Sequence, residues 1–256
     1  MSEHAAFLAA VLAAPDDDLP RLIYADWLDE RGDPRGEFIR LQIAAFHGDI
    51  SAGRAASAIE RECGRIWAGP LASWAYQVGF CRGFAETLII RGEEFLVRVA
   101  KIFRLAPIQR IALIGVRESL RPILRMPHLA YLRGLHLTGC GLTNRDAQKI
   151  ADSQHLRTLH TLRLANNEIG CAGLVALAAS DGLPELQQLD LANNDVSDFG
   201  ARALANTKTL TSLQSINLSG NAVSQIGENA LWHSPALSAT RVQLAGQRSK
   251  QLAAVC

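Results

Sequence analysis

Aliphatic residues recur at a fixed interval along the second half of the chain. The pattern L-x-x-L-x-L-x-x-N/C-x-L occurs four times, and successive copies start 27 residues apart. Inside each copy, apolar and polar positions alternate as in a strand with one buried face. A glycine at the same interval, as at Gly173, opens a stretch with helical spacing. The pattern predicts repeated strand, turn and helix units, which begin at Leu132, Leu159, Leu186 and Leu213.

A small polar or thiol side chain occupies the turn position of every copy: Cys140, Asn167, Asn194 and Asn221. We expect each to satisfy backbone groups of the adjacent turn, with Cys140 a structural substitution rather than a nucleophile. One unit buries too little apolar surface to offset its ordering entropy, so the units must stabilise one another. The end copies should therefore be atypical, as in the final strand around Val242 and Leu244, which has Gln247 at the turn position.

Weaker copies precede the regular ones. A degenerate copy starts at Ile108, 24 residues before the first regular one. Before it, the segment FAETLII predicts a strand. The helix predicted next carries Phe95, Val99 and Ile102 on one face.

The repeated pattern resembles the leucine-rich repeat, and it is similar to the ribonuclease-inhibitor-like class. The resemblance implies an α/β fold: a right-handed solenoid shaped as a horseshoe, with parallel strands on the concave face and helices on the convex face. We expect this domain to span 80–256, with regular 27-residue repeats from about 132 to 239 and degenerate repeats at both ends.

The first 79 residues lack the repeat and predict a small all-α domain that caps the solenoid. Helices are expected over about 3–13, after the acidic run at 16–18, after Asp33-Pro34, and over about 51–67. The second helix should bury a stripe formed by Leu19, Leu22, Ile23 and Trp27. Asp17 and Arg21 have the spacing of an ion pair along that helix.

The contiguous stretch YADWLDERGDPRGEF, within about residues 3–47, resembles the repeat-companion domain at the N-terminus of many bacterial leucine-rich repeat proteins. Residues 80–113 also resemble the segment that joins this domain to its repeats. The resemblance implies architecture and a general expectation of protein binding, without an activity that could be assigned to residues. The motif positions are Tyr24, Asp26, Trp27, Arg31, Gly32, Asp33, Arg35, Gly36 and Glu37.

Charge changes this picture locally. The formal net charge is only +1, with 26 Lys and Arg against 25 Asp and Glu, which argues against nucleic acid and anionic membranes as partners. Residues 1–37 hold nine acids and three bases, whereas 80–133 hold ten bases and four acids. We expect the basic section to pair with an acidic partner or with the acidic N-terminal helices. No apolar run or leader suggests a membrane or secreted protein, and the five cysteines form no C-x-x-C pair, so a cytoplasmic monomer with reduced thiols is expected.

The candidate binding site is a row of side chains between the second and third leucines of each copy, because these positions face away from the core. A protein or peptide partner would bind along this concave row. The alternative is a solvated surface without a partner. The row comprises His136, Arg163, Asp190, Asn217 and Gln243, flanked by Arg133, His160, Gln187 and Gln214.

The row lacks a nucleophile with an oriented base, and the chain has no metal or cofactor motif, so we expect no enzyme activity, no cofactor and no metal. A second hypothesis is a regulator of a small GTPase, because similar repeats occur in Ran GTPase-activating proteins, with Arg145 as the rim candidate. A third is that the acidic companion domain has an activity or a metal-dependent role of its own.

Overall fold

The computed structural model describes residues 3–247, and the chain divides into two compact units. The first comprises Met1–Ile90 and Arg98–Gln109, and the second Arg91–Val97 and Arg110–Cys256. Helix α6 (Gly92–Leu105) therefore contributes to both. The predicted thiol at Cys256 lies outside the described residues.

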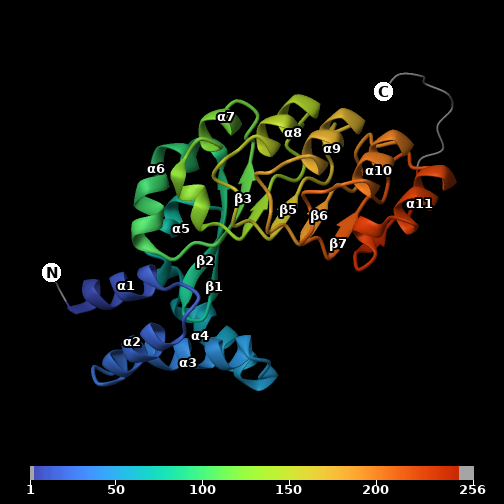
Figure 1. Cartoon of the computed structure of the whole chain (residues 1–256). Helices are drawn as coiled ribbons and strands as arrows, with labels where there is room; N and C mark the ends of the chain where they lie inside the picture. The colour runs from blue at the N-terminus through green and yellow to red at the C-terminus, as the bar shows by residue number, and fades with distance from the viewer. Residues whose placement is uncertain (1–2, 248–256) are drawn as a thin grey trace. The chain divides into compact units, whose positions relative to one another are not determined.

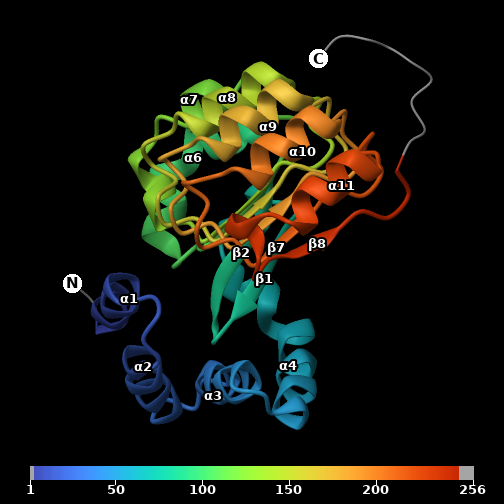
Figure 2. The same ribbon diagram turned by 45° about the vertical axis from the view of Figure 1, so that its right-hand side comes forward.

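Helices make up most of the first unit, and their bounds lie close to the predicted ones. Gly32 at the end of α2 has a left-handed φ of +67°, and Asp33 Oδ1 accepts a hydrogen bond from the Arg35 N–H at 2.9 Å. Helices α1 to α4 follow one another, each packed on the next (Figure 2). The helices are α1 (Glu3–Ala13), α2 (Leu19–Asp29), α3 (Arg35–Phe46), α4 (Ile50–Ala68) and α5 (Leu71–Trp74).

The first unit is not all-helical, and it extends past residue 79. Strands β1 (Gln77–Cys81) and β2 (Phe84–Arg91) pair antiparallel within it. Phe84 enters the helical core, where its ring centroid lies 5.8 Å from that of Tyr24. This packing explains why the hairpin groups with the helices rather than with the repeats.

The predicted apolar stripe of α2 is half right, because Leu22 and Trp27 are partly buried and pack against the core. Leu19 and Ile23 are 60% and 47% exposed, whereas the buried face of α2 carries Arg21 and Tyr24. The helix is rotated because a buried acid, described below, draws the arginine inward. The core of the unit consists of Val11, Tyr24, Ala25, Leu28, Ile39, Ile43 and Phe84.

Six strands of the second unit pair in parallel in chain order, in the register that the repeat predicts. Helices α8 to α11 lie in a row along one side of these strands (Figure 1). The strands are β3 (Arg110–Ile114), β4 (Gly134–His136), β5 (Thr161–Arg163), β6 (Gln188–Asp190), β7 (Ser215–Asn217) and β8 (Arg241–Gln243). The helices are α7 (Leu120–Ile123), α8 (Asn144–Ala151), α9 (Cys171–Ala178), α10 (Asp198–Ala205) and α11 (Gln225–Trp232), with short 3-10 turns at Pro127–Tyr131 and Pro235–Leu237.

The repeat leucines form the core of this unit. Leu135, Leu162, Leu189 and Ile216 face inward from successive strands and are buried. Val242 in β8 is only half-buried, consistent with a degenerate last copy. The α6 helix buries Phe95, Val99 and Ile102, as its pattern predicts.

One residue at the same position of each copy has the backbone conformation that makes the sharp turn after each strand. The residue before the turn position has a left-handed φ between +53° and +70° in five successive copies. Glycine and asparagine tolerate this conformation best, which accounts for the residue types found there. The five residues are Gly139, Asn166, Asn193, Gly220 and Gly246.

Candidate functional site

Strand register places the predicted binding residues side by side. His136 pairs with Arg163, Arg163 with Asp190, Asp190 with Asn217, and Asn217 with Gln243. We call these five residues the polar strip. Because parallel strands lie about 4.8 Å apart, the strip is about 19 Å long.

The side chains of the polar strip are accessible, and two of them are held in place. Arg163 and Gln243 are exposed, and the other three are half-buried. Asp190 Oδ1 accepts a hydrogen bond from the Ala192 N–H at 3.1 Å, and Asn217 Oδ1 accepts one from Ser219 at 3.0 Å. Each carboxylate or amide is thereby oriented before any partner binds.

Positive charge gathers at the β3 to β5 end of the polar strip. Arg110 extends across Gly134, where an added Cβ would lie 3.2 Å from the Arg110 Cγ. Burial lowers the pKa of His136, and the charges of Arg163 and Arg110 lower it further, against the opposing effect of Asp190. His136 is therefore neutral at pH 7 and presents one donor and one acceptor between two cations.

The flanking residues precede the strands, and two of them converge on an acid that the repeat pattern did not single out. Arg133 Nη1 lies 3.6 Å and His160 Nε2 lies 3.8 Å from Glu185 Oε2. Gln187 is half-buried and Gln214 is exposed, at the corresponding positions before β6 and β7. Glu185 directly precedes the first leucine of its copy, whereas Arg133 and His160 directly follow theirs, so the repeat register alone did not bring the three together.

The turn residues form a ladder of hydrogen bonds between copies. Asn167 Oδ1 accepts from the N–H groups of Cys140 and Leu142, each at 3.0 Å, and its Nδ2 donates to the carbonyl of Leu137 at 2.9 Å. Asn194 and Asn221 repeat this arrangement in the next two turns.

The ladder differs at its two ends. Gln247 takes over at the last turn, accepting from the Val223 N–H at 3.1 Å and donating to the Leu218 carbonyl at 2.9 Å. The Cys140 thiol lies 3.4 Å from the Leu113 carbonyl, and burial raises the pKa of the thiol. A protonated thiol at this position fits a packing role better than a nucleophilic one.

A further set of hydrogen bonds connects successive copies near the ends of their helices. The leucine pattern did not predict it. In each case a hydroxyl donates to a backbone carbonyl of the preceding copy, 29 residues earlier in the sequence. The 27-residue spacing of serine and threonine was the signal available in the sequence. The residues are Ser153, Ser180, Thr207 and Ser234.

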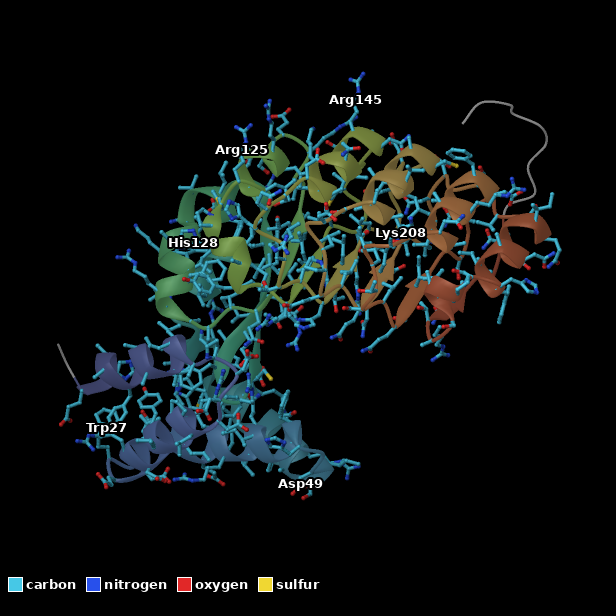
Figure 3. All side chains as sticks on the ribbon, viewed as in Figure 1. Trp27, Asp49, Arg125, His128, Arg145 and Lys208 are labelled. Atoms are coloured by element: carbon cyan, nitrogen blue, oxygen red, sulfur yellow. The ribbon has the colours of Figure 1, made fainter. Side chains whose placement is uncertain are left out.

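Arg145, the candidate for GTPase regulation, is the second residue of α8 and is exposed. It extends into solvent from the helix side of the unit (Figure 3). No residue of the polar strip lies on this helix. The structure therefore does not bring Arg145 together with the predicted binding residues.

The companion-domain motif divides between the surface and the core of the first unit. Trp27 lies beside the guanidinium of Arg31, which is 4.0 Å from its ring centroid and pairs with Glu3 at 3.2 Å (Figure 3). Asp26 pairs with Arg40, and Glu37 is exposed.

Two further motif residues have structural roles. Gly36 allows α2 and α3 to approach closely, because an added Cβ would meet the backbone oxygen of Ala25 at 2.7 Å. Tyr24 is buried, and its hydroxyl is hydrogen-bonded to His4 Nδ1 at 2.7 Å.

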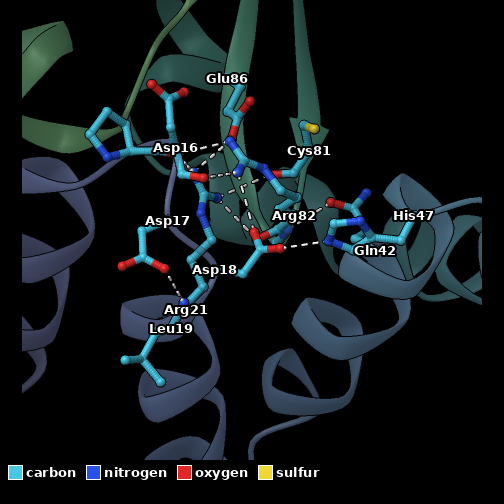
Figure 4. Close-up of polar contacts among 12 residues, drawn as sticks. Asp16, Asp17, Asp18, Leu19, Arg21, Gln42, His47, Cys81, Arg82 and Glu86 are labelled. Atoms are coloured by element: carbon cyan, nitrogen blue, oxygen red, sulfur yellow. Dashed lines mark hydrogen bonds and ion pairs between the residues drawn. The ribbon is translucent and has the colours of Figure 1, made fainter.

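Arg21 does not pair with Asp17 as predicted. It is fully buried, and its Nη2 lies 2.7 Å from Oε1 of Glu86, which is 1% exposed (Figure 4). Arg82 donates to the same oxygen at 3.1 Å and to Asp18 at 3.2 Å. The expected pairing of the basic section with the acidic N-terminal segment thus holds at Arg82.

The same cluster holds the α1–α2 loop. Arg21 and Arg82 both donate to the carbonyl of Pro15, at 2.7 and 2.8 Å, and Arg82 also donates to the carbonyl of Asp16 at 3.0 Å. Burial lowers the pKa of Arg21, and the charge of Glu86 opposes that effect. Two guanidinium groups and one carboxylate therefore fix this loop to the β1–β2 hairpin.

Residues 3–247 show neither a metal cluster nor a membrane-spanning helix. No group of three or more His, Cys, Asp and Glu side chains in this range could hold a metal ion. None of the helices described is long and apolar enough to cross a membrane.

Comparison with known proteins identifies the repeats. A family model described as Leucine Rich repeat matches residues 128–151, 155–178 and 183–205. No curated protein matches the sequence. The chain therefore contains three leucine-rich repeats, a type of repeat that generally mediates protein–protein interaction and is typically noncatalytic. Strand register extends the same unit through β7 and β8.

Proposed function

We propose that the second unit is a noncatalytic interaction module or scaffold that binds a protein or peptide along the polar strip. The observation that carries this proposal is the strand register, which aligns five polar side chains from five consecutive strands. A row about 19 Å long suits an extended peptide or one edge of a folded partner.

The charges of the strip indicate the chemistry of the partner. Arg110 and Arg163 flank neutral His136 at one end, so a partner should present acidic side chains there. Asp190 and Asn217 retain acceptor capacity beside the hydrogen bonds that orient them, so donor groups should face the middle of the strip. We also propose that the chain acts as a monomer in the cytoplasm, since the four cysteines of the described residues are free thiols.

The test uses the full chain as bait in the native lysate, followed by affinity measurements with each purified partner. A variant with alanine at His136, Arg163, Asp190 and Asn217 is compared with a control that changes exposed Arg145 and Lys208 on other surfaces (Figure 3). We expect at least tenfold weaker binding for the strip variant, equivalent to about 1.4 kcal/mol, and wild-type binding for the control.

Two outcomes would contradict the proposal. An equal loss of partner binding in the strip variant and the control variant would indicate nonspecific electrostatic binding. A partner that is retained by the strip variant would bind elsewhere on the chain.

Binding to the strip should also weaken with salt, because the arginines lie near the surface.

A further inference from the structure

The first unit contains a partly enclosed cavity of about 150 Å³. Its lining residues include three aromatic ones, Tyr24 in α2, Trp67 in α4 and Phe84 in β2. Four of the lining residues are exposed, so the cavity is open to solvent: His4, Gly69, Pro70 and Leu105. A cavity of this size holds a group about as large as benzene.

Arg35 brings a positive charge to this cavity, and among the described residues no carboxylate lies within 4.0 Å of its guanidinium, although the charge of nearby Asp33 acts on it. Its guanidinium carbon lies 5.1 Å from the ring centroid of Phe84, 5.9 Å from Trp67 and 6.0 Å from Tyr24. Its side chain makes one long hydrogen bond, from Nη2 to the carbonyl of Gly83 at 3.5 Å, and its buried Nε has no partner among residues 3–247. Burial lowers the pKa of Arg35, against the opposing effects of Tyr24 and Asp33.

Arg35 is half-buried and differs from the two buried arginines of this unit in its counterion, whereas an Nε without a hydrogen-bond partner is common to all three among the described residues. Arg21 and Arg82 share the carboxylate of Glu86, whereas Arg35 faces a cavity instead. A buried guanidinium without a counterion is costly, and aromatic faces offset only part of that cost. An anion that enters the cavity would supply the ion pair that Arg35 lacks.

We propose that the cavity binds a small organic carboxylate, whose charge pairs with Arg35 and whose apolar body packs among Tyr24, Trp67 and Phe84. The single positive charge favours a monoanion, and the aromatic walls favour a flat ring of about the size of benzoate. Inorganic phosphate fits less well, because it carries no apolar surface to cover the rings. This site is independent of the polar strip, so either proposal can fail alone.

The experiment is ligand-observed fluorine NMR of 4-fluorobenzoate with the full chain. We expect line broadening that unlabelled benzoate reverses and inorganic phosphate does not. 4-Fluorobenzamide, which has the same shape without the charge, should bind about tenfold more weakly. N-acetylphenylalanine tests a chain-terminal carboxylate: equal competition would indicate a peptide end as the natural source, and weaker competition a free acid.

Variants locate the binding. Arg35→Gln should weaken 4-fluorobenzoate binding about tenfold or more, whereas Arg61→Gln, a change at an exposed arginine of the same unit, should leave it unchanged. Ala106→Leu, which enlarges a buried residue of the cavity wall, should abolish binding with Arg35 intact and serves if Arg35→Gln does not fold. Absence of broadening at millimolar ligand, equal binding of the benzamide, or wild-type binding by folded Arg35→Gln or Ala106→Leu would overturn the proposal.

Discussion

The two units satisfy their buried polar groups in different ways. The second unit uses neutral side chains that recur every 27 residues, and each bonds to the backbone of a neighbouring copy. The first unit uses a single charged cluster, in which Glu86 serves both Arg21 and Arg82. In the ladder, each copy makes a similar small contribution to the stability of the second unit. In the cluster, a large contribution to the stability of the first unit depends on one carboxylate. The two units should therefore respond differently to single substitutions.

Glu86→Gln should have the largest effect on stability. Two buried guanidinium groups would lose their shared carboxylate, which costs about 3 to 5 kcal/mol. The measurement is urea unfolding of the full chain in a Trp232→Phe background, so that the fluorescence comes from the three tryptophans of the first unit. Glu37→Gln, at an exposed position of α3, is the control. A loss below about 1 kcal/mol would show that the cluster is not the main support of the α1–α2 loop.

Leu189→Ala tests the core of the central repeat. Leu189 is buried between neighbouring strands, so its truncation should cost about 2 to 5 kcal/mol. Gln188→Ala, one residue away and exposed, should change stability by less than about 0.5 kcal/mol. Denaturant unfolding followed by circular dichroism measures both. Equal losses would contradict the assignment of inward and outward faces in β6.

Asn194→Ala tests one rung of the ladder. It removes the acceptor for the Ile169 N–H and the donor to the Leu164 carbonyl, at 3.0 and 2.9 Å, inside a buried turn. The expected cost is about 1 to 3 kcal/mol, below that of Glu86→Gln because no charge is left unpaired. Asn206→Ala at an exposed helix end is the control. A loss as large as that of Glu86→Gln would erase the difference between ladder and cluster.

Arg163→Ala should have the smallest effect on stability and a clear effect on titration. The pKa of His136 is lowered first by burial and then by Arg163, so this variant should raise that pKa in an NMR titration. Because the folded pKa lies below the ordinary 6.5, the contribution of His136 is fully present above pH 6.5 and is lost as the pH falls below it. The loss of stability at acid pH should be smaller in Arg163→Ala. Lys208→Ala should leave the titration of His136 unchanged. An unchanged pKa of His136 in Arg163→Ala would show that the charge of Arg163 does not act on His136.

Much of the second unit followed from local patterns. Leucine spacing predicted the strands, and the turn position predicted side chains that bond to adjacent backbone. The same register predicted the row from His136 to Gln243, although its charge balance depends on Arg110, which lies outside the regular repeat. The convergence of Arg133 and His160 on Glu185 was missed, because three separate copies supply that contact.

The sequence alone was enough to determine the repeated unit, its strand register and the helical character of the N-terminal segment, because these depend on neighbours at short or constant spacing. Only the tertiary structure decided which face of α2 is buried, since the partner of Arg21 stands 65 residues away in β2. It also decided that the hairpin belongs to the first unit and that Arg35 lines a cavity. A lone arginine in a helix has the pattern of a solvated residue, and Arg21 is buried because a distant chain segment supplies its counterion.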